Sequence, residues 1–206
     1  MTWEYQSETW MFYGLSDLYY SFHTSEEWVF DYHCSFFAVT ALEKYLKSRL
    51  IYSRKDLDPD ATEPEIESKF LLYAKRYSHK FEEMIHEAES LLGGERLSSI
   101  LDRSHDGYIG RELVAVLKDA YMETRYPTSQ FVSQAFPLGD NVYHNPLSSS
   151  GLLHFVQAMC RELTYGLAGN ISVPKVYENV EKTYSHLEPF SRFRNLYTPE
   201  LWSKSP

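Results

Sequence analysis

Apolar positions along the chain recur every three or four residues, which is the period of an α-helix with one buried face. The pattern is most regular over residues 26–52. A helix that is apolar over much of its circumference is usually central in its domain, so we expect a central helix of roughly 40 Å there. Its main stripe consists of Trp28, Tyr32, Phe36, Val39, Leu42, Leu46 and Leu50, and a second set, Phe37, Ala41 and Tyr45, widens it.

Shorter patterns of the same kind predict further helices on both sides of the long one. Strand signals are weak, because Asp106-Gly107 lacks the alternating apolar flanks of a hairpin. We therefore expect an all-α fold, an antiparallel up-and-down helical bundle of about six or seven helices. The shorter helices are expected near residues 8–22, 64–77, 79–92, 108–125, 151–167 and 174–186, and residues 95–101 could add a short one.

The length of 206 residues fits one domain. We expect residues 1–127 to form the core of the bundle and residues 128–206 to form a helical extension packed on the same domain. Residues 127–150 are irregular and rich in proline, asparagine and serine. A loop of this length in a compact domain is often functional or mobile.

Composition narrows the classes of function. The net charge of −9 repels polyphosphate backbones, which argues against a general nucleic-acid coat but leaves room for a local basic patch. The two cysteines, Cys34 and Cys160, are too few for a disulfide framework and are expected to be buried thiols in a reducing compartment. Neither a signal peptide nor a membrane span is predicted, so we expect a cytoplasmic protein.

The usual motifs of metal and nucleophile chemistry are absent from the sequence. His79, Glu83 and His86 share one predicted helix face, but a di-metal bundle needs a second Glu-x-x-His, and none is present. Cys34 follows His33, yet neighbouring helical residues point about 100° apart. We expect no metal and no cofactor, and interpret these residues as a solvated helix face and core packing.

One basic group is a candidate anion site. Lys75, Arg76 and Lys80 flank Tyr77-Ser78-His79 at a predicted junction between helices. The N-terminus of a helix attracts anions, so this junction is a candidate site for a phosphate or a nucleotide. The simpler interpretation is a Ser78 N-cap beside ordinary surface lysine and arginine residues.

Three segments together resemble a known family. Residues 36–50, FFAVTALEKYLKSRL, resemble the signature helix of HEPN domains (higher eukaryotes and prokaryotes nucleotide-binding), which ends in a Glu-Lys-x-Leu-Lys pattern. Residues 78–81 look like the family's Gly-His-Asp-Leu junction, with His79 unchanged. Residues 124–127 are similar to its Thr-Arg-Tyr-Pro. The order also matches, and the resemblance covers roughly residues 8–127. Glu43, Lys44, Leu46 and Lys47 carry the match in the helix.

The resemblance implies a helical bundle that is often a homodimer. Many members are ribonucleases with an Arg-x(4–6)-His motif, whereas others bind nucleotides. Here Arg76 precedes His79 by only three residues. We therefore expect a non-catalytic HEPN-like protein that is dimeric and binds a nucleotide, a nucleic acid or a protein partner. The expected ligand-binding residues are Lys44, Lys47, Lys75, Arg76, His79, Lys80 and Arg125.

Two alternatives stay open. The first is a divergent, metal-independent ribonuclease, in which His79 acts as a general base and Arg76 stabilises charge on phosphorus. The second is a structural or scaffolding helical protein without a ligand. In addition, Arg125 has an interpretation without a ligand, because a cation at the end of a helix interacts favourably with the last carbonyls.

Overall fold

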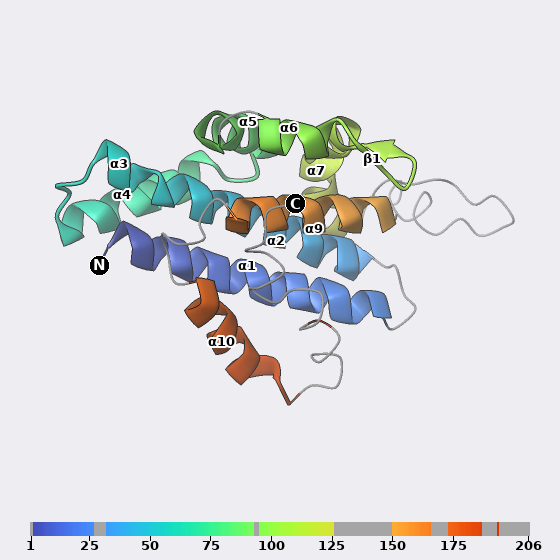
Figure 1. Cartoon of the computed structure of the whole chain (residues 1–206), viewed down its shortest axis with the longest axis horizontal. Helices are drawn as coiled ribbons and strands as arrows, with labels where there is room; N and C mark the ends of the chain where they lie inside the picture. The colour runs from blue at the N-terminus through green and yellow to red at the C-terminus, as the bar shows by residue number, and fades with distance from the viewer. Residues whose placement is uncertain are drawn as a thin grey trace, which may run out of the picture.

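The computed structural model describes residues 2–26, 32–92, 95–125, 150–165, 173–186 and 193. It confirms the all-α fold, because the only strands in the described residues form a two-stranded hairpin (Figure 1). None of the described helices has the length and the apolar character that crossing a membrane requires. The elements are α1 (Trp3–Glu26), α2 (Tyr32–Tyr52), α3 (Arg54–Leu57), α4 (Glu63–Arg76), α5 (Phe81–Leu92), α6 (Glu95–Leu101), β1 (Ser104–His105), β2 (Tyr108–Ile109), α7 (Gly110–Arg125), α9 (Ser150–Tyr165) and α10 (Val173–Tyr184).

Helix α2 is central, as its apolar pattern predicts. In Figure 1, α1 runs along one side of it, and α5, α6 and α7 lie on the opposite side. Helix α9 also packs against α2, and α10 packs against α1. The predicted start of the long helix is wrong, however, because Glu26 is the last residue of α1. Both helices have the same apolar period, so periodicity does not mark the break between them.

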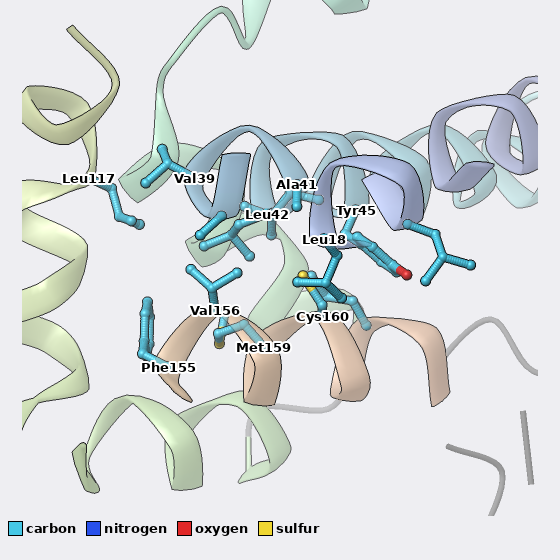
Figure 2. Packing of buried hydrophobic residues seen from close by; sticks show 14 of the residues in the cluster. Leu18, Val39, Ala41, Leu42, Tyr45, Leu117, Phe155, Val156, Met159 and Cys160 are labelled. Atoms are coloured by element: carbon cyan, nitrogen blue, oxygen red, sulfur yellow. The ribbon is translucent and has the colours of Figure 1, made fainter. Parts of the chain in front are cut away.

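The core lies between α2, α9, α1 and α7. Figure 2 shows Leu42 of α2 facing Val156 of α9, and Val39 of α2 beside Leu117 of α7. The predicted stripe is buried from Val39 onward, whereas Phe36 and Phe37 are half-buried. Both cysteines are buried and free, as expected, and burial raises the pKa of the Cys160 thiol well above its ordinary value. The reducing compartment stays a prediction.

Small side chains let α1 and α2 approach closely. The hydroxyls of Ser7 and Ser48 lie 2.9 Å apart, and each also donates to the other residue's backbone carbonyl, at 3.0 and 2.8 Å. A Cβ added to Gly14 would come within 2.8 Å of the Tyr45 ring. Further along the pair, the Ser21 hydroxyl donates to the Cys34 carbonyl at 3.1 Å. These pairings fix α1 and α2 as antiparallel neighbours.

The hairpin corrects the prediction that Asp106-Gly107 does not form one. Strands β1 and β2 are antiparallel, and between them Asp106 and Gly107 have φ of 49° and 94°. Two successive residues with positive φ form the type I′ turn, which the Asp-Gly dipeptide favours. Each strand is only two residues long, so no alternation of apolar residues is needed. Helix α7 consequently begins at Gly110 instead of residue 108.

Several predicted features lie outside the described residues. They include Trp28, nearly all of the predicted loop 127–150, and Tyr126-Pro127.

Candidate functional site

The α4–α5 turn, residues 77–80, is the junction that the sequence singled out. Helix α4 ends at Arg76 and α5 begins at Phe81, so the prediction that His79 begins a helix is wrong. The reason is the backbone of His79, whose φ of 56° is left-handed and cannot continue a right-handed helix. The turn is closed by the Ser78 N–H donating to Lys75 O and the Lys80 N–H donating to Tyr77 O, both at 3.3 Å. Ser78 is therefore not an N-cap.

His79 is held in this conformation by contacts with two other helices. Its Nδ1 lies 3.2 Å from Oε2 of Glu43 on α2, and its backbone N–H points to Oε1 of the same carboxylate at 3.5 Å. Its ring stacks on Tyr121 of α7, with the centroids 3.7 Å apart. Glu43 and His79 come from two of the segments that carry the family resemblance. The structure thus brings together two residues that lie 36 positions apart.

Glu43 is at the same time half of a buried ion pair. Lys47 Nζ lies 2.6 Å from Glu43 Oε1, and each side chain is only 8% exposed. The Lys47 ammonium also lies 5.0 Å from the centroid of the Trp10 ring. A buried charge is tolerated only when it is paired, so each of these two residues keeps the other in the interior. Lys47, an expected ligand-binding residue, is thus bonded inside the protein.

Lys44 is also bonded to a neighbouring helix. Its ammonium pairs with the Asp17 carboxylate on α1 and lies 5.9 Å from the Tyr13 ring centroid. Burial raises the pKa of Asp17 above its ordinary value, and the positive charge of Lys44 opposes that shift. The expected binding residues Lys44 and Lys47 therefore both connect α2 to partners within the bundle.

The remaining expected residues are more exposed and face different places. Lys80 pairs with Glu83 at 3.1 Å. Lys75 is exposed and forms no ion pair with the described part of the chain. The Arg76 guanidinium lies 5.4 Å from the Tyr77 ring centroid. Arg125 ends α7, and its side chain lies outside the described residues.

The first of two hollows near the turn is a groove of about 660 Å³ between α5 and α7. His79 lines this groove with its side chain 31% exposed, and Nε2 forms no hydrogen bond within the described residues. The charged residues around it are mixed in sign. The basic residues are Lys80 and Lys118, and the acidic residues are Glu82, Glu83 and Asp119. The charges that line the groove therefore do not favour the binding of an anion.

The second hollow, which we call the Arg76 pocket, has a volume of about 570 Å³ and is formed by α1, α3 and α4 with the residue after α3. Most of its charged groups are paired: Arg54 with Glu87 at 2.8 Å, and Lys69 with Asp58. Arg76 forms no ion pair with any described residue. The lining residues are Trp3, Arg54, Leu57, Asp58, Lys69, Leu72 and Arg76.

Of these lining residues, only Arg76 is among the ligand-binding residues that the sequence predicts. The others lie on three segments that are separated along the chain by as many as about seventy residues. Their spacing carries no local signal, because the pocket exists only when α1, α3 and α4 are packed together.

A half-buried hydrogen-bond network connects the Arg76 pocket to the α4–α5 turn. Glu87 of α5 accepts from the Tyr77 hydroxyl and from Arg54 Nη2. Burial raises the pKa of Tyr77 to about 12, and the Glu87 carboxylate adds to the shift. Arg54 lines the pocket, and Tyr77 begins the turn.

Comparisons with protein families, curated proteins and solved structures found no match to this chain. The resemblance to HEPN domains therefore stays a prediction from motifs. Within the described residues, no group of three or more His, Cys, Asp and Glu side chains is arranged to hold a metal ion. What the fold and the two hollows define is an all-α helical protein with a histidine-lined groove and a separate cationic pocket.

Proposed function

We propose that this chain is a non-catalytic binding module and that the Arg76 pocket holds an anionic ligand. The observation that carries the proposal is that Arg76 lines the pocket and has no ion-pair partner among the described residues. A guanidinium binds carboxylate or phosphate through two parallel hydrogen bonds. Trp3, Leu57 and Leu72 provide apolar walls for the rest of the ligand. Pockets that bind ligands commonly combine apolar walls with a few polar groups.

The resemblance to HEPN domains supports the same proposal, since nucleotide-binding members exist. A nucleotide, a nucleic acid and an acidic protein segment each offer an anionic group beside a less polar part. Of the expected binding residues, Arg76 and Lys75 are the ones whose charges no described carboxylate neutralises and whose side chains the structure describes as exposed. The homodimer stays a proposal, and light scattering at micromolar concentration measures it directly.

The experiment is a titration of the full chain with ATP, GTP and an acidic peptide, repeated with Arg76→Ala. A hydrogen-bonded charge contributes about 1.5–3 kcal/mol, so the variant should bind roughly ten- to a hundredfold more weakly. Lys80→Ala is the matched control, because Lys80 is an exposed cation that pairs with Glu83 and lines the other hollow. Unchanged binding in Arg76→Ala would exclude the pocket as the site.

A second candidate function is a divergent ribonuclease that uses His79. The observation in its favour is the contact between Nδ1 and the Glu43 carboxylate, which favours the tautomer with a proton on Nδ1 and an acceptor at Nε2. An imidazole held this way can act as a general base. Arg76, however, lines the other hollow, so the Arg76–His79 pair does not meet in one cleft of a single chain.

The test is cleavage of a structured RNA by the full chain and by His79→Ala. Loss of cleavage in His79→Ala, with retention in Arg76→Ala, would favour a histidine base without the arginine. Full cleavage by His79→Ala would reject the ribonuclease. If no RNA is cleaved and no anion binds through Arg76, the scaffolding alternative is the one that stands.

A further inference from the structure

Three leucines at one end of the molecule are unusually exposed. Leu57 of α3 is 67% exposed, and Leu71 and Leu72 of α4 are 54% and 65% exposed. Figure 1 shows α3 and α4 lying together at the end of the bundle where the chain begins. Single exposed aliphatic residues are ordinary, but a group of them beside a hollow marks an interaction surface. We call these three residues the leucine patch.

The leucine patch extends beyond the Arg76 pocket. Leu57 and Leu72 line the pocket, whereas Leu71 does not. On α4, Lys69, Leu72 and Arg76 follow each other at spacings of three and four, so they share one face that lines the pocket. Leu71 and Lys75, four residues apart, form a neighbouring exposed stripe. The apolar and cationic surface is therefore longer than a single small ligand in the pocket would cover.

The charges along α4 are separated by sign. Its first turn is acidic, and Glu65 there accepts hydrogen bonds from the Thr62 N–H at 2.8 Å and the Thr62 hydroxyl at 2.7 Å. Its last turn carries Lys75 and Arg76, both exposed and without an ion pair in the described part of the chain. The whole chain has a net charge of −9, so this cationic end is a local exception. An acidic partner complements it.

We infer that the leucine patch, with Lys75 and Arg76, docks an acidic amphipathic helix of another protein. The inference rests on the proposed function, because the Arg76 pocket takes part of the same partner. A helix lying along α4 places its apolar face on the leucines and one large apolar side chain in the pocket beside Trp3. Its carboxylates then reach Lys75 and Arg76. This is the helix-in-groove mode of recognition, in which apolar anchors recur at intervals of three and four residues.

Two other occupants fit the surface less well. A nucleotide fills the pocket and reaches Arg76 but leaves Leu71 in water. A second copy of the chain that presents the same end brings two cationic ends together, and like charges across an interface oppose association. Of these three occupants, the acidic helix is the one that covers the three leucines and neutralises both cations.

The probe is a designed, fluorescently labelled peptide of about 18 residues, long enough for a helix of several turns. It has leucines at helical spacing on one face and glutamates on the other. A scrambled peptide of the same composition and a version with lysines in place of the glutamates are the peptide controls. Binding to the full chain is measured by fluorescence anisotropy, with ATP as a competitor.

The designed peptide is expected to bind at least about tenfold more tightly than either control peptide. Arg76→Glu and the double variant Leu71→Ser/Leu72→Ser should each weaken its binding by about tenfold or more. Leu91→Ser, on α5 and 37% exposed, is the matched control and should leave binding unchanged. Circular dichroism of each variant shows that the helices are intact.

Equal binding of the designed and scrambled peptides overturns the inference. So does unchanged binding of the designed peptide by the double leucine variant. If a nucleotide binds through Arg76 and the designed peptide neither binds nor competes, the inference fails while the proposed function stands. If no anionic probe depends on Arg76, both fail.

Discussion

Glu43 of the central helix contacts His79 of the α4–α5 turn, with 3.2 Å between Oε2 and Nδ1. The same carboxylate pairs with Lys47 through its other oxygen at 2.6 Å. The buried Glu43 side chain therefore contacts both Lys47, one turn along the same helix, and His79, whose backbone N–H points to the same carboxylate. This explains how a histidine with a left-handed backbone is held at the edge of the groove.

Replacing Glu43 should be among the most destabilising single changes to a polar residue of this protein. In Glu43→Gln the Lys47 ammonium stays buried without its counterion, and breaking a buried pair costs roughly 3–5 kcal/mol. Chemical denaturation measures the loss. The double variant Glu43→Gln/Lys47→Met should recover much of it, because the unpaired charge is gone. Glu83→Gln, in an exposed pair with Lys80, is the control and should change the free energy of unfolding by less than about 1 kcal/mol.

The role of Glu43 also shows what hydropathy could and could not predict. The apolar period of residues 26–52 correctly predicts that α2 is central, because a buried helix repeats apolar residues every three or four positions. Hydropathy gives no sign that Glu43 and Lys47 are buried, since an i,i+4 charge pair is typical of a solvated helix face. The structure buries both residues. Their burial depends on helices that pack around α2, which no local pattern encodes.

Local chemistry and tertiary packing explain the other differences. The Asp106-Gly107 hairpin follows from turn preference alone, and two-residue strands are too short to show an alternating pattern. His79 is a candidate because of its motif, and the structure places it against Glu43 at the edge of the groove. The Arg76 pocket could be predicted only in part, because Trp3 and Leu57 reach Arg76 through the packing of α1 and α3 with α4.

The left-handed backbone of His79 should be measurable by comparing two substitutions. Both His79→Ala and His79→Gly remove the ring and its contacts with Glu43 and Tyr121. Only glycine adopts a φ near 56° without steric cost, and other residues lose about 1–2 kcal/mol there. His79→Gly should therefore be more stable than His79→Ala by roughly 1 kcal/mol in chemical denaturation. The opposite order would mean that the turn changes conformation when the ring is lost.

The close approach of α1 and α2 should make Gly14 sensitive to a single added methyl group. The Cβ of Gly14→Ala would lie 2.8 Å from Cδ2 of Tyr45 and 3.2 Å from Cβ of Lys44. Overpacking of this kind costs typically 1–3 kcal/mol, which exceeds the gain of roughly 1 kcal/mol in helix propensity. Thermal unfolding should show a lower Tm for Gly14→Ala. Thr9→Ala, at a half-buried position of the same helix, is the control. A Tm at or above wild type for Gly14→Ala would contradict the tight packing.

Tyr77 should make the stability of the protein sensitive to alkaline pH. Burial and the Glu87 carboxylate raise the pKa of this phenol from 10.0 to about 12 in the folded state. Between these two values the unfolded chain releases a proton that the folded chain keeps. The unfolded state then binds fewer protons, so the free energy of unfolding falls as pH rises through this window.

Tyr77→Phe removes this titration, so its free energy of unfolding should fall less steeply than that of wild type between pH 10 and about 12. Urea denaturation at a series of pH values measures the two slopes. Tyr5→Phe is the matched control, because the Tyr5 side chain is exposed and no described carboxylate accepts a hydrogen bond from its hydroxyl. It should follow the wild-type slope. If Tyr77→Phe and wild type have the same slope, burial and the Tyr77–Glu87 hydrogen bond do not hold the phenol in its protonated form.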